Sequence, residues 1–577
     1  MQKTKQSLTL ISFLLLATLT LSACSGALNA PISEDGLSKG TDGPLAGDDV
    51  SSTPTATPEP VSVFLSDALP DGMLDDAAMG DFTLSSGPGA DLWVGPGALA
   101  PEGEVLLESV WVYALAAPFP TLADAVPLAD LQAYWSGGRP EALADVSRLY
   151  LPAPLSATWE AALGAADTEQ VSVYETLPEA DALWAENAWA VLPFDELRPQ
   201  LKVIAVDGVS PLPRDFDPAT APLVVRLQLV AATAVGQSLP EADRQALNAA
   251  FTPTNRDPEK LTTLVMTGVT ALVRATANKM EINGVLYPAE KIVDWLAEAD
   301  LTHISNEVSF YENCPAPDPH SRLLYFCSSP KYIDLFDYVG ADIIELTGNH
   351  NNDSKEMFGV DVVPFSLNLY EEHGMDYYGG GLDLEDAKSP LTITDHGNKL
   401  AFIGCNSLGP LHAWATEEYG GAAPCGDYQW MADEISRLKA EGYLPIATFQ
   451  YAENYSNLPS ENQVRDFGMM ADAGAVIVNG SQAHRSKAMT FRNGAFVDYG
   501  LGNLFFDQMG IVDAFGNYIP ETRWEIIQRH TFYDGQYLST ELLTAMLEDY
   551  AQPRPMTEAE RATFLTSLFD ASGWETR

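Results

Sequence analysis

The stretch Gly348-Asn349-His350-Asn351-Asn352-Asp353 decides the fold, because it follows almost directly on an apolar run predicted to be a strand, residues 341–346. A similar strand ends at 304–305 and runs into Asn306-Glu307. Further predicted strands end at polar residues too, and they lie at 261–266, 401–405, 444–449 and 475–478. In α/β proteins, polar residues at the carboxyl ends of buried strands form the functional sites. The sequence therefore predicts an α/β domain with a site at these strand ends.

Six short segments of this region occur in a fixed order. The longest is Tyr499-Gly500-Leu501-Gly502-Asn503-Leu504-Phe505-Phe506-Asp507, and Gly348–Asp353 is another. The remaining four are M-T-G-V at 266–269, N-E at 306–307, Y-A-E-N-Y at 451–455 and G-S-Q-A-H at 480–484. Together they resemble the CapA family of poly-γ-glutamate capsule biosynthesis proteins. The resemblance implies a calcineurin-like metallophosphoesterase fold, an αββα sandwich, over residues 256–577.

The resemblance also implies a metal centre, because two-metal hydrolases gather carboxylate, imidazole and amide-oxygen ligands from several strand ends. His350 is the implied catalytic residue, which would protonate a leaving oxygen or clamp the substrate. Glu453 has a second interpretation, in which it only holds a ligand residue in place. Asp353 is expected to cap the turn that follows it. The implied metal ligands are Glu307, Asn349, Glu453 and His484.

Three positions depart from the family pattern. Val269, Gln450 and Gln482 stand where the resemblance implies one aspartate and two histidines, and they are expected to line the same pocket. Valine offers no ligand atom, and glutamine binds transition metals far more weakly than imidazole does. The remaining ligands predict a site for a single divalent ion, Mn²⁺, Mg²⁺ or Ca²⁺. Metal-dependent hydrolysis and non-catalytic binding of a polymer or small molecule both stay open.

The N-terminus predicts export. Residues 1–23 read as a lipoprotein signal peptide, with an apolar run at 8–21 that ends in a lipobox-like Leu21-Ser22-Ala23-Cys24. Cys24 would carry the lipid; the alternative is an ordinary signal peptide cleaved after residues 25–27. Residues 24–60 are rich in Gly, Ser, Thr, Pro and Asp and predict a disordered linker. These features place the protein on the outer face of the cell membrane, attached through the lipid anchor only.

Four further cysteines, Cys314, Cys327, Cys405 and Cys425, make an even number, which in an exported chain predicts disulfides. Three pairings exist, and the sequential one, Cys314–Cys327 with Cys405–Cys425, is favoured because it closes short loops rich in turn-forming residues. No C-x-x-C spacing occurs, which argues against a zinc site.

Residues 61–255 predict a separate α/β domain, with strands at 110–115, 188–192, 203–206 and 224–231. This part loosely resembles a periplasmic solute-binding protein; the alternative is an α/β spacer that binds nothing. Capping boxes are expected at Ser238/Glu241 and at Thr557/Glu560, each opening a helix.

The charge balance excludes one class of partner. The chain has 80 Asp and Glu against 31 Lys and Arg, a formal charge of -49. Such a surface repels phosphate backbones, so nucleic acid is not an expected partner. The expected function is capsule or cell-envelope polymer synthesis or attachment, with poly-γ-glutamate implied by the family alone.

Overall fold

The computed structural model describes residues 60–75, 82–512 and 516–577, and residues 60–577 form one compact unit. The predicted signal peptide, Cys24 and nearly all of the predicted linker lie outside the described residues. Within the described ranges, no helix is both long and apolar enough to cross a membrane.

The first part of the chain builds a ten-stranded sheet around one long strand, β4 (Glu104–Pro118). The four predicted strands of this part are confirmed, since β4, β8 (Trp189–Pro193), β9 (Leu201–Val206) and β10 (Val224–Ala231) cover them. The other strands are β1 (Ser62–Leu65), β2 (Thr83–Leu84), β3 (Leu92–Pro96), β5 (Ala125–Val126), β6 (Leu149–Pro152) and β7 (Val171–Tyr174). The helices are α1 (Leu128–Trp135), α2 (Ala153–Leu163), α3 (Ala180–Glu186), α4 (Ala234–Gln237) and α5 (Glu241–Ala250).

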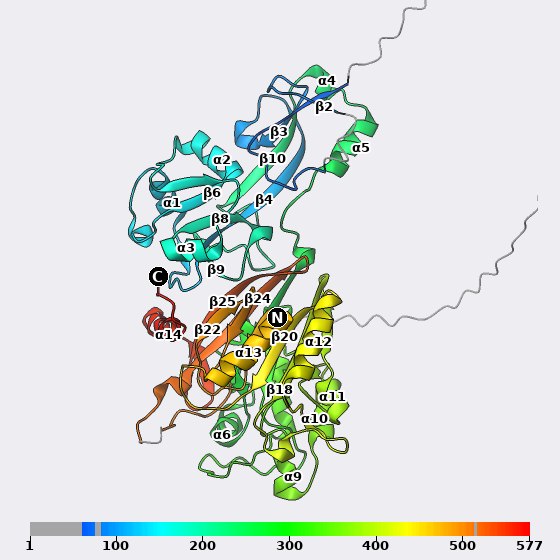
Figure 1. Cartoon of the computed structure of the whole chain (residues 1–577), viewed down its shortest axis with the longest axis vertical. Helices are drawn as coiled ribbons and strands as arrows, with labels where there is room; N and C mark the ends of the chain where they lie inside the picture. The colour runs from blue at the N-terminus through cyan, green and yellow to red at the C-terminus, as the bar shows by residue number, and fades with distance from the viewer. Residues whose placement is uncertain (1–59, 76–81, 513–515) are drawn as a thin grey trace, which may run out of the picture. The chain divides into compact units, whose positions relative to one another are not determined.

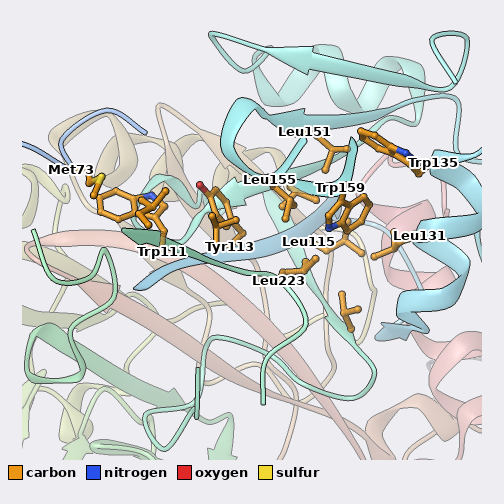
Figure 2. Packing of buried hydrophobic residues seen from close by; sticks show 14 of the residues in the cluster. Met73, Trp111, Tyr113, Leu115, Leu131, Trp135, Leu151, Leu155, Trp159 and Leu223 are labelled. Carbon is orange, nitrogen blue, oxygen red and sulfur yellow. The ribbon is translucent and has the colours of Figure 1, made fainter. Parts of the chain in front are cut away.

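An aromatic core holds this sheet to its helices. Figure 2 shows Trp111, Tyr113 and Leu115 of β4 in the same cluster as Trp135 and Trp159 from α1 and α2. The rings of Trp135 and Trp159 meet edge to face with centroids 5.7 Å apart. Alternate residues of β4 contribute to this core because successive side chains of a strand point to opposite faces.

The predicted capping box at Ser238 is wrong. Helix α5 begins at Glu241 with Pro240 at its N-cap, and no side chain caps it. Pro240 disfavours the helical conformation of the preceding residue, Leu239, so the helix starts after Pro240 and not at the serine. The box at Thr557 and Glu560 is confirmed and opens α14 (Glu558–Ala571).

The second part contains two packed sheets (Figure 1). The first sheet has the strand order β15 (Asp376–Tyr378), β14 (Ile343–Glu345), β13 (Leu301–Asn306), β11 (Leu261–Met266), β24 (Trp524–Tyr533), β25 (Gln536–Glu548) and β26 (Gln552–Pro555), with β12 (Val269–Thr270) beside β13. The second has the order β17 (Leu391–Asp395), β18 (Asn398–Asn406), β20 (Leu444–Gln450), β21 (Ile477–Asn479), β23 (Ala495–Asp498) and β22 (Met489–Arg492). A small ladder joins β16 (Gly380–Gly381) to β19 (Gly421–Ala422).

Helices cover the outer faces of both sheets, so the predicted αββα sandwich is confirmed. Leu264 of the first sheet and Phe402 and Ile446 of the second share one core cluster between the sheets. Helices α12 and α13 pack on the second sheet. The helices of this part are α6 (Arg274–Asn283), α7 (Val293–Ala297), α8 (Ile333–Val339), α9 (Asp353–Phe358), α10 (Val363–Glu372), α11 (Leu384–Lys388), α12 (Gln429–Ala440), α13 (Glu461–Ala473) and α14.

His530 on β24 predicts a pH dependence of stability. It is fully buried; burial, together with the charge of His303, lowers the pKa of His530 to about 3 from 6.5. Between these pH values the unfolded chain binds the proton and the folded chain does not, so stability falls as pH falls through this window. We expect a loss of about 1.4 kcal/mol per pH unit from this residue, measured by chemical denaturation.

The variant His530→Asn removes the titrating group and keeps an amide for the bond that His530 Nδ1 makes with Thr540 Oγ1 (2.9 Å). Its unfolding free energy should fall less steeply below pH 6.5 than that of the wild type. The exposed His320 offers a control, since His320→Asn should keep the wild-type slope. Parallel curves for wild type and His530→Asn would contradict the prediction.

Candidate functional site

The segment Gly348–Asp353 leaves strand β14 and packs directly against the end of β13. His350 forms a bridge with Val308 of the segment that follows β13. A Cβ atom on Gly348 would lie 2.6 Å from the Cα of Glu307, so only glycine allows the two backbones to approach this closely. The chain therefore brings Asn349 and His350 next to Glu307.

Glu307 is a buried carboxylate without a hydrogen bond. Its residue is 1% exposed, and neither side-chain oxygen has a hydrogen-bond partner among the described residues. The imidazole of His484 lies beside it, with Nε2 3.7 Å from Glu307 Oε1. Asn503 orients this imidazole, because its Oδ1 is 3.0 Å from His484 Nδ1. Two residues that lie far apart in the sequence thus meet at one point.

Buried amide oxygens accompany this carboxylate. The side-chain oxygens of Asn349, Gln450 and Gln482 are buried and have no hydrogen-bond partner among the described residues. Gln482 donates its amide to Ser305 Oγ (2.6 Å), which lies shortly before Glu307 in the chain. Buried oxygens without a donor cost free energy unless a cation or water satisfies them. The residues present therefore fit a positively charged group.

Hydrogen bonds between the strand ends place Gln450 on the same edge. Asn406, the register partner of Gln450, donates to the carbonyl of Thr347 (2.9 Å). Thr347 and Ser481 both donate to Glu345 Oε1 at 2.6 Å. These bonds tie the ends of β14, β18 and β21 together, so the candidate residues come from one edge of the sandwich.

Glu453 has both oxygens occupied by the backbone. The N–H groups of Tyr455 and His484 donate to them at 2.5 and 2.6 Å. Lys487 Nζ lies 3.7 Å from the same carboxylate. Of the two interpretations of Glu453, this geometry favours the one in which it holds His484 in place.

The expectation that Asp353 caps the following turn is wrong, because no side chain caps α9 and the Asp353 carboxylate binds other groups. Asp353 is the first residue of α9, and it accepts hydrogen bonds from His350 Nδ1 (2.6 Å), His412 Nε2 (3.0 Å) and the Phe326 N–H (2.8 Å). Burial opposes a charged imidazole, but the bond to Asp353 and the charge of Glu307 outweigh it and raise the pKa of His350. Asp353 therefore fixes the orientation of His350.

Two residues near the site, His412 and Arg274, were not predicted from the sequence. His412 lies in the loop closed by Cys405 and Cys425, and no motif marks it. Arg274 binds Asp507 with Nη2 at 2.5 Å and Nε at 3.2 Å, and it stacks over the ring of Phe506. Asp507 ends the longest motif, so its motif position was a signal for this ion pair.

Both favoured disulfides are present, Cys314–Cys327 and Cys405–Cys425. Each closes a loop that reaches the candidate site. The first loop carries Phe326, whose ring centroid is 4.6 Å from that of His350, and the second carries His412.

Part of the chain is similar to known proteins. Residues 263–508 match the family described as "Bacterial capsule synthesis protein PGA_cap". The PGA biosynthesis protein CapA of Bacillus subtilis (strain 168) is 25% identical over 207 residues, 36% of this chain and 52% of that protein. Residues 263–508 belong to the CapA family.

A second CapA relative gives similar values. The capsule biosynthesis protein CapA of Bacillus anthracis is 24% identical over 259 residues, 44% of this chain and 62% of that protein. The chain thus spans between half and two thirds of the length of these relatives. The family match, residues 263–508, lies within the sandwich part, and the ten-stranded sheet lies outside it.

Solved structures also match parts of the chain. A 5'-nucleotidase precursor from Thermus thermophilus is 13% identical, with a TM-score of 0.28, covering 54% of this chain and 59% of that one. An ABC-type phosphate transport receptor from Vibrio cholerae is 9% identical, with a TM-score of 0.24, covering 33% of this chain and 92% of that one.

Val269, the CapA-motif position where an aspartate was implied, lies in an apolar cluster. It is fully buried with Val308, Phe326 and Phe506. Its backbone binds the longest motif, because its N–H donates to the Gly502 carbonyl (2.9 Å) and its carbonyl accepts from Leu504. Apolar packing therefore fills the position where the resemblance implies a ligand.

A different group of side chains in this CapA-like part has metal-ligand spacing. Among the described residues, Asp300, Asp395 and His396 each offer a ligand atom, all within 4.8 Å of one another. Arg214 Nη1 already donates to Asp300 Oδ1 (2.9 Å) and lies 3.2 Å from His396 Nδ1. This guanidinium supplies the positive charge, so the group acts as an ion-pair cluster.

Proposed function

We propose that this protein is an exported, lipid-anchored CapA-like protein that acts in the synthesis or attachment of a capsule or cell-envelope polymer. Its sandwich part binds one divalent cation, Mg²⁺, Mn²⁺ or Ca²⁺. The observation that carries the proposal is Glu307, whose two buried oxygens have no hydrogen-bond partner among the described residues and lie beside His484, with Nε2 3.7 Å from Oε1. A buried carboxylate costs free energy unless a positive group or a proton neutralises it.

The donor set favours one ion over two. Glu307, Asn349 and His484 would hold it, since carboxylate, amide-oxygen and imidazole donors suit a hard or borderline divalent ion. Glu453 is occupied by backbone N–H groups, and Val269 is packed among apolar side chains. A second ion would therefore lack ligands at the positions of Glu453 and Val269.

The bound ion would polarise a phosphoryl or carbonyl oxygen of the substrate. His350, which Asp353 holds at 2.6 Å, would donate a proton to the leaving oxygen. The ring of Phe326 packs edge to face against this imidazole. The metal ligands and His350 lie at one edge of the sandwich, and the polymer would reach them from that edge.

A second candidate function is binding without catalysis. It is favoured by the replacement of three implied ligands by Val269, Gln450 and Gln482. The local cations are already paired, Arg274 with Asp507 and Lys487 with Glu453, so they offer little free charge to a polyanion. A bound cation would supply that charge in either function.

Metal analysis tests the proposal. The purified full chain is soaked in Mn²⁺, dialysed and assayed for metal, and its hydrolysis of a phosphodiester reporter is measured with and without chelator. About one ion per chain, with chelator-sensitive hydrolysis, supports the enzyme. One ion without hydrolysis supports the binding function, and no bound ion after soaking contradicts both.

The lipid anchor gives a separate prediction. Cys24→Ser should move the protein from the membrane fraction to the soluble fraction, because a single cysteine would carry the whole anchor. Cell fractionation followed by immunoblotting measures this shift. The matched control is Ser25→Ala, which keeps the cysteine and should stay with the membrane. Membrane retention of Cys24→Ser would contradict the lipoprotein assignment.

A further inference from the structure

A pocket of about 320 Å³ lies among β9, β25 and α14, away from the candidate metal site. Its size is at the lower end of the range for small-molecule sites. None of the candidate-site residues lines it. Its walls are largely apolar and aromatic, with contributions from Phe119, Val203, Trp295, Met556, Leu565 and Phe569.

One side of the pocket carries a satisfied ion pair. Lys202 Nζ donates to Asp124 Oδ1 (2.7 Å) and to the carbonyls of Thr121 (2.8 Å) and Leu122 (3.3 Å). These three acceptors use all the N–H groups of the ammonium. Lys202 and Asp124 therefore stabilise the wall and leave little for a ligand.

Arg561 has one guanidinium nitrogen that donates no hydrogen bond to the described residues. Its Nη2 donates to Asp124 Oδ1 at 2.8 Å, but its Nη1 is buried and has no hydrogen-bond partner among the described residues. An unpaired guanidinium nitrogen in a largely apolar environment costs free energy. A ligand carboxylate would relieve this cost, and a guanidinium is well suited to bind one.

Glu541 is an acidic residue of the pocket wall that makes only a long ion-pair contact. Its nearest cation is Arg529, whose Nη1 lies 3.9 Å away, beyond hydrogen-bond distance. Burial raises the pKa of Glu541, and the pairing with Arg529 offsets this only in part. A ligand ammonium group beside this carboxyl would favour its charged form.

We propose that this pocket binds a small zwitterion with an apolar body, the chemistry of an apolar amino acid or dipeptide. Its carboxylate pairs with Arg561, its ammonium group with Glu541, and its apolar side chains with the aromatic walls. The pocket already contains two cations and two acids, Lys202 and Arg561 with Asp124 and Glu541, so a ligand without net charge keeps this balance. The proposal is independent of the metal site and of the CapA-like function.

Isothermal titration calorimetry of the full chain with the dipeptide leucyl-phenylalanine tests the proposal. We expect measurable binding, and about 10–100-fold weaker binding by Arg561→Lys, which keeps a cation for Asp124 but loses the second nitrogen. Glu541→Gln should weaken binding as well. The same dipeptide with an acetylated N-terminus and an amidated C-terminus lacks both charges and should bind at least about 10-fold more weakly.

Arg437→Lys, on the exposed surface of α12, is the matched control and should bind like the wild type. Thermal unfolding of each variant confirms that the fold is retained. No binding by the dipeptide, equal binding by Arg561→Lys, or equal binding of the uncharged dipeptide would each overturn the proposal.

Discussion

Glu307→Gln should weaken divalent-ion binding strongly and stabilise the metal-free protein. The substitution replaces a charged ligand by a neutral amide of the same shape, so we expect the dissociation constant for Mn²⁺ to rise about 100-fold. In chelator, the wild type carries a buried carboxylate with no hydrogen-bond partner among the described residues, and the variant does not. The unfolding free energy in chelator should therefore rise by about 1–3 kcal/mol.

Glu525 provides the matched control. It is a fully buried glutamate on β24 whose two oxygens also lack hydrogen-bond partners within the described part of the chain. Burial raises the pKa of Glu525 well above its usual range, which favours its neutral form. Glu525→Gln should leave Mn²⁺ affinity unchanged. Calorimetry and denaturation in chelator measure both effects, and unchanged Mn²⁺ affinity of Glu307→Gln would contradict the metal site.

The sequence predicted the strands of the sandwich because each is a continuous apolar run. Strand β20 shows the reason, since it lies between the parallel strands β18 and β21 and all of its residues from Leu444 to Gln450 are buried. Such a strand needs no alternation of polar and apolar residues. The polar residue at its end then marks the edge where the candidate side chains meet.

The candidate site could be predicted only in part. The resemblance to the CapA motifs indicated Glu307 and His484. The two oxygens of Glu453, however, face backbone N–H groups, and a backbone conformation leaves no mark in residue identity. His412 reaches Asp353 from a loop whose path depends on the disulfide between Cys405 and Cys425. This loop contains one histidine, so no characteristic spacing between ligand residues marks His412 in the sequence.

In the N-terminal part, short sequence patterns failed to predict where a helix starts and how long a strand is. Ser238 and Glu241 have the spacing of a capping box, yet Pro240 prevents a helical start at the serine. Strand β4 is 15 residues long, whereas the apolar run at 110–115 marks only its buried section. The exposed residues at its start pair with β10, and pairing partners far apart in sequence are set by the tertiary fold.

Restoring the implied ligands should convert the site into a stronger metal centre. Val269→Asp alone places a carboxylate in an apolar cluster and should cost about 3–5 kcal/mol of unfolding free energy in chelator. Combined with Gln450→His and Gln482→His, it adds one carboxylate and two imidazoles next to Glu307. The triple variant should bind Mn²⁺ at least about 10-fold more tightly than the wild type.

The metal should also return stability to the triple variant, by about 2.7 kcal/mol when free Mn²⁺ is about 100 times its dissociation constant. Val265→Asp, at another fully buried valine on β11, is the control for the cost of burying a carboxylate, and Mn²⁺ should not rescue it beyond the wild-type effect. Denaturation curves with Mn²⁺ and with chelator give both quantities. The opposite result is a triple variant that binds Mn²⁺ no more tightly than the wild type. That result would mean that apolar packing around Val269 leaves no room for a second metal ion, and non-catalytic binding would become the better account of this CapA-like site.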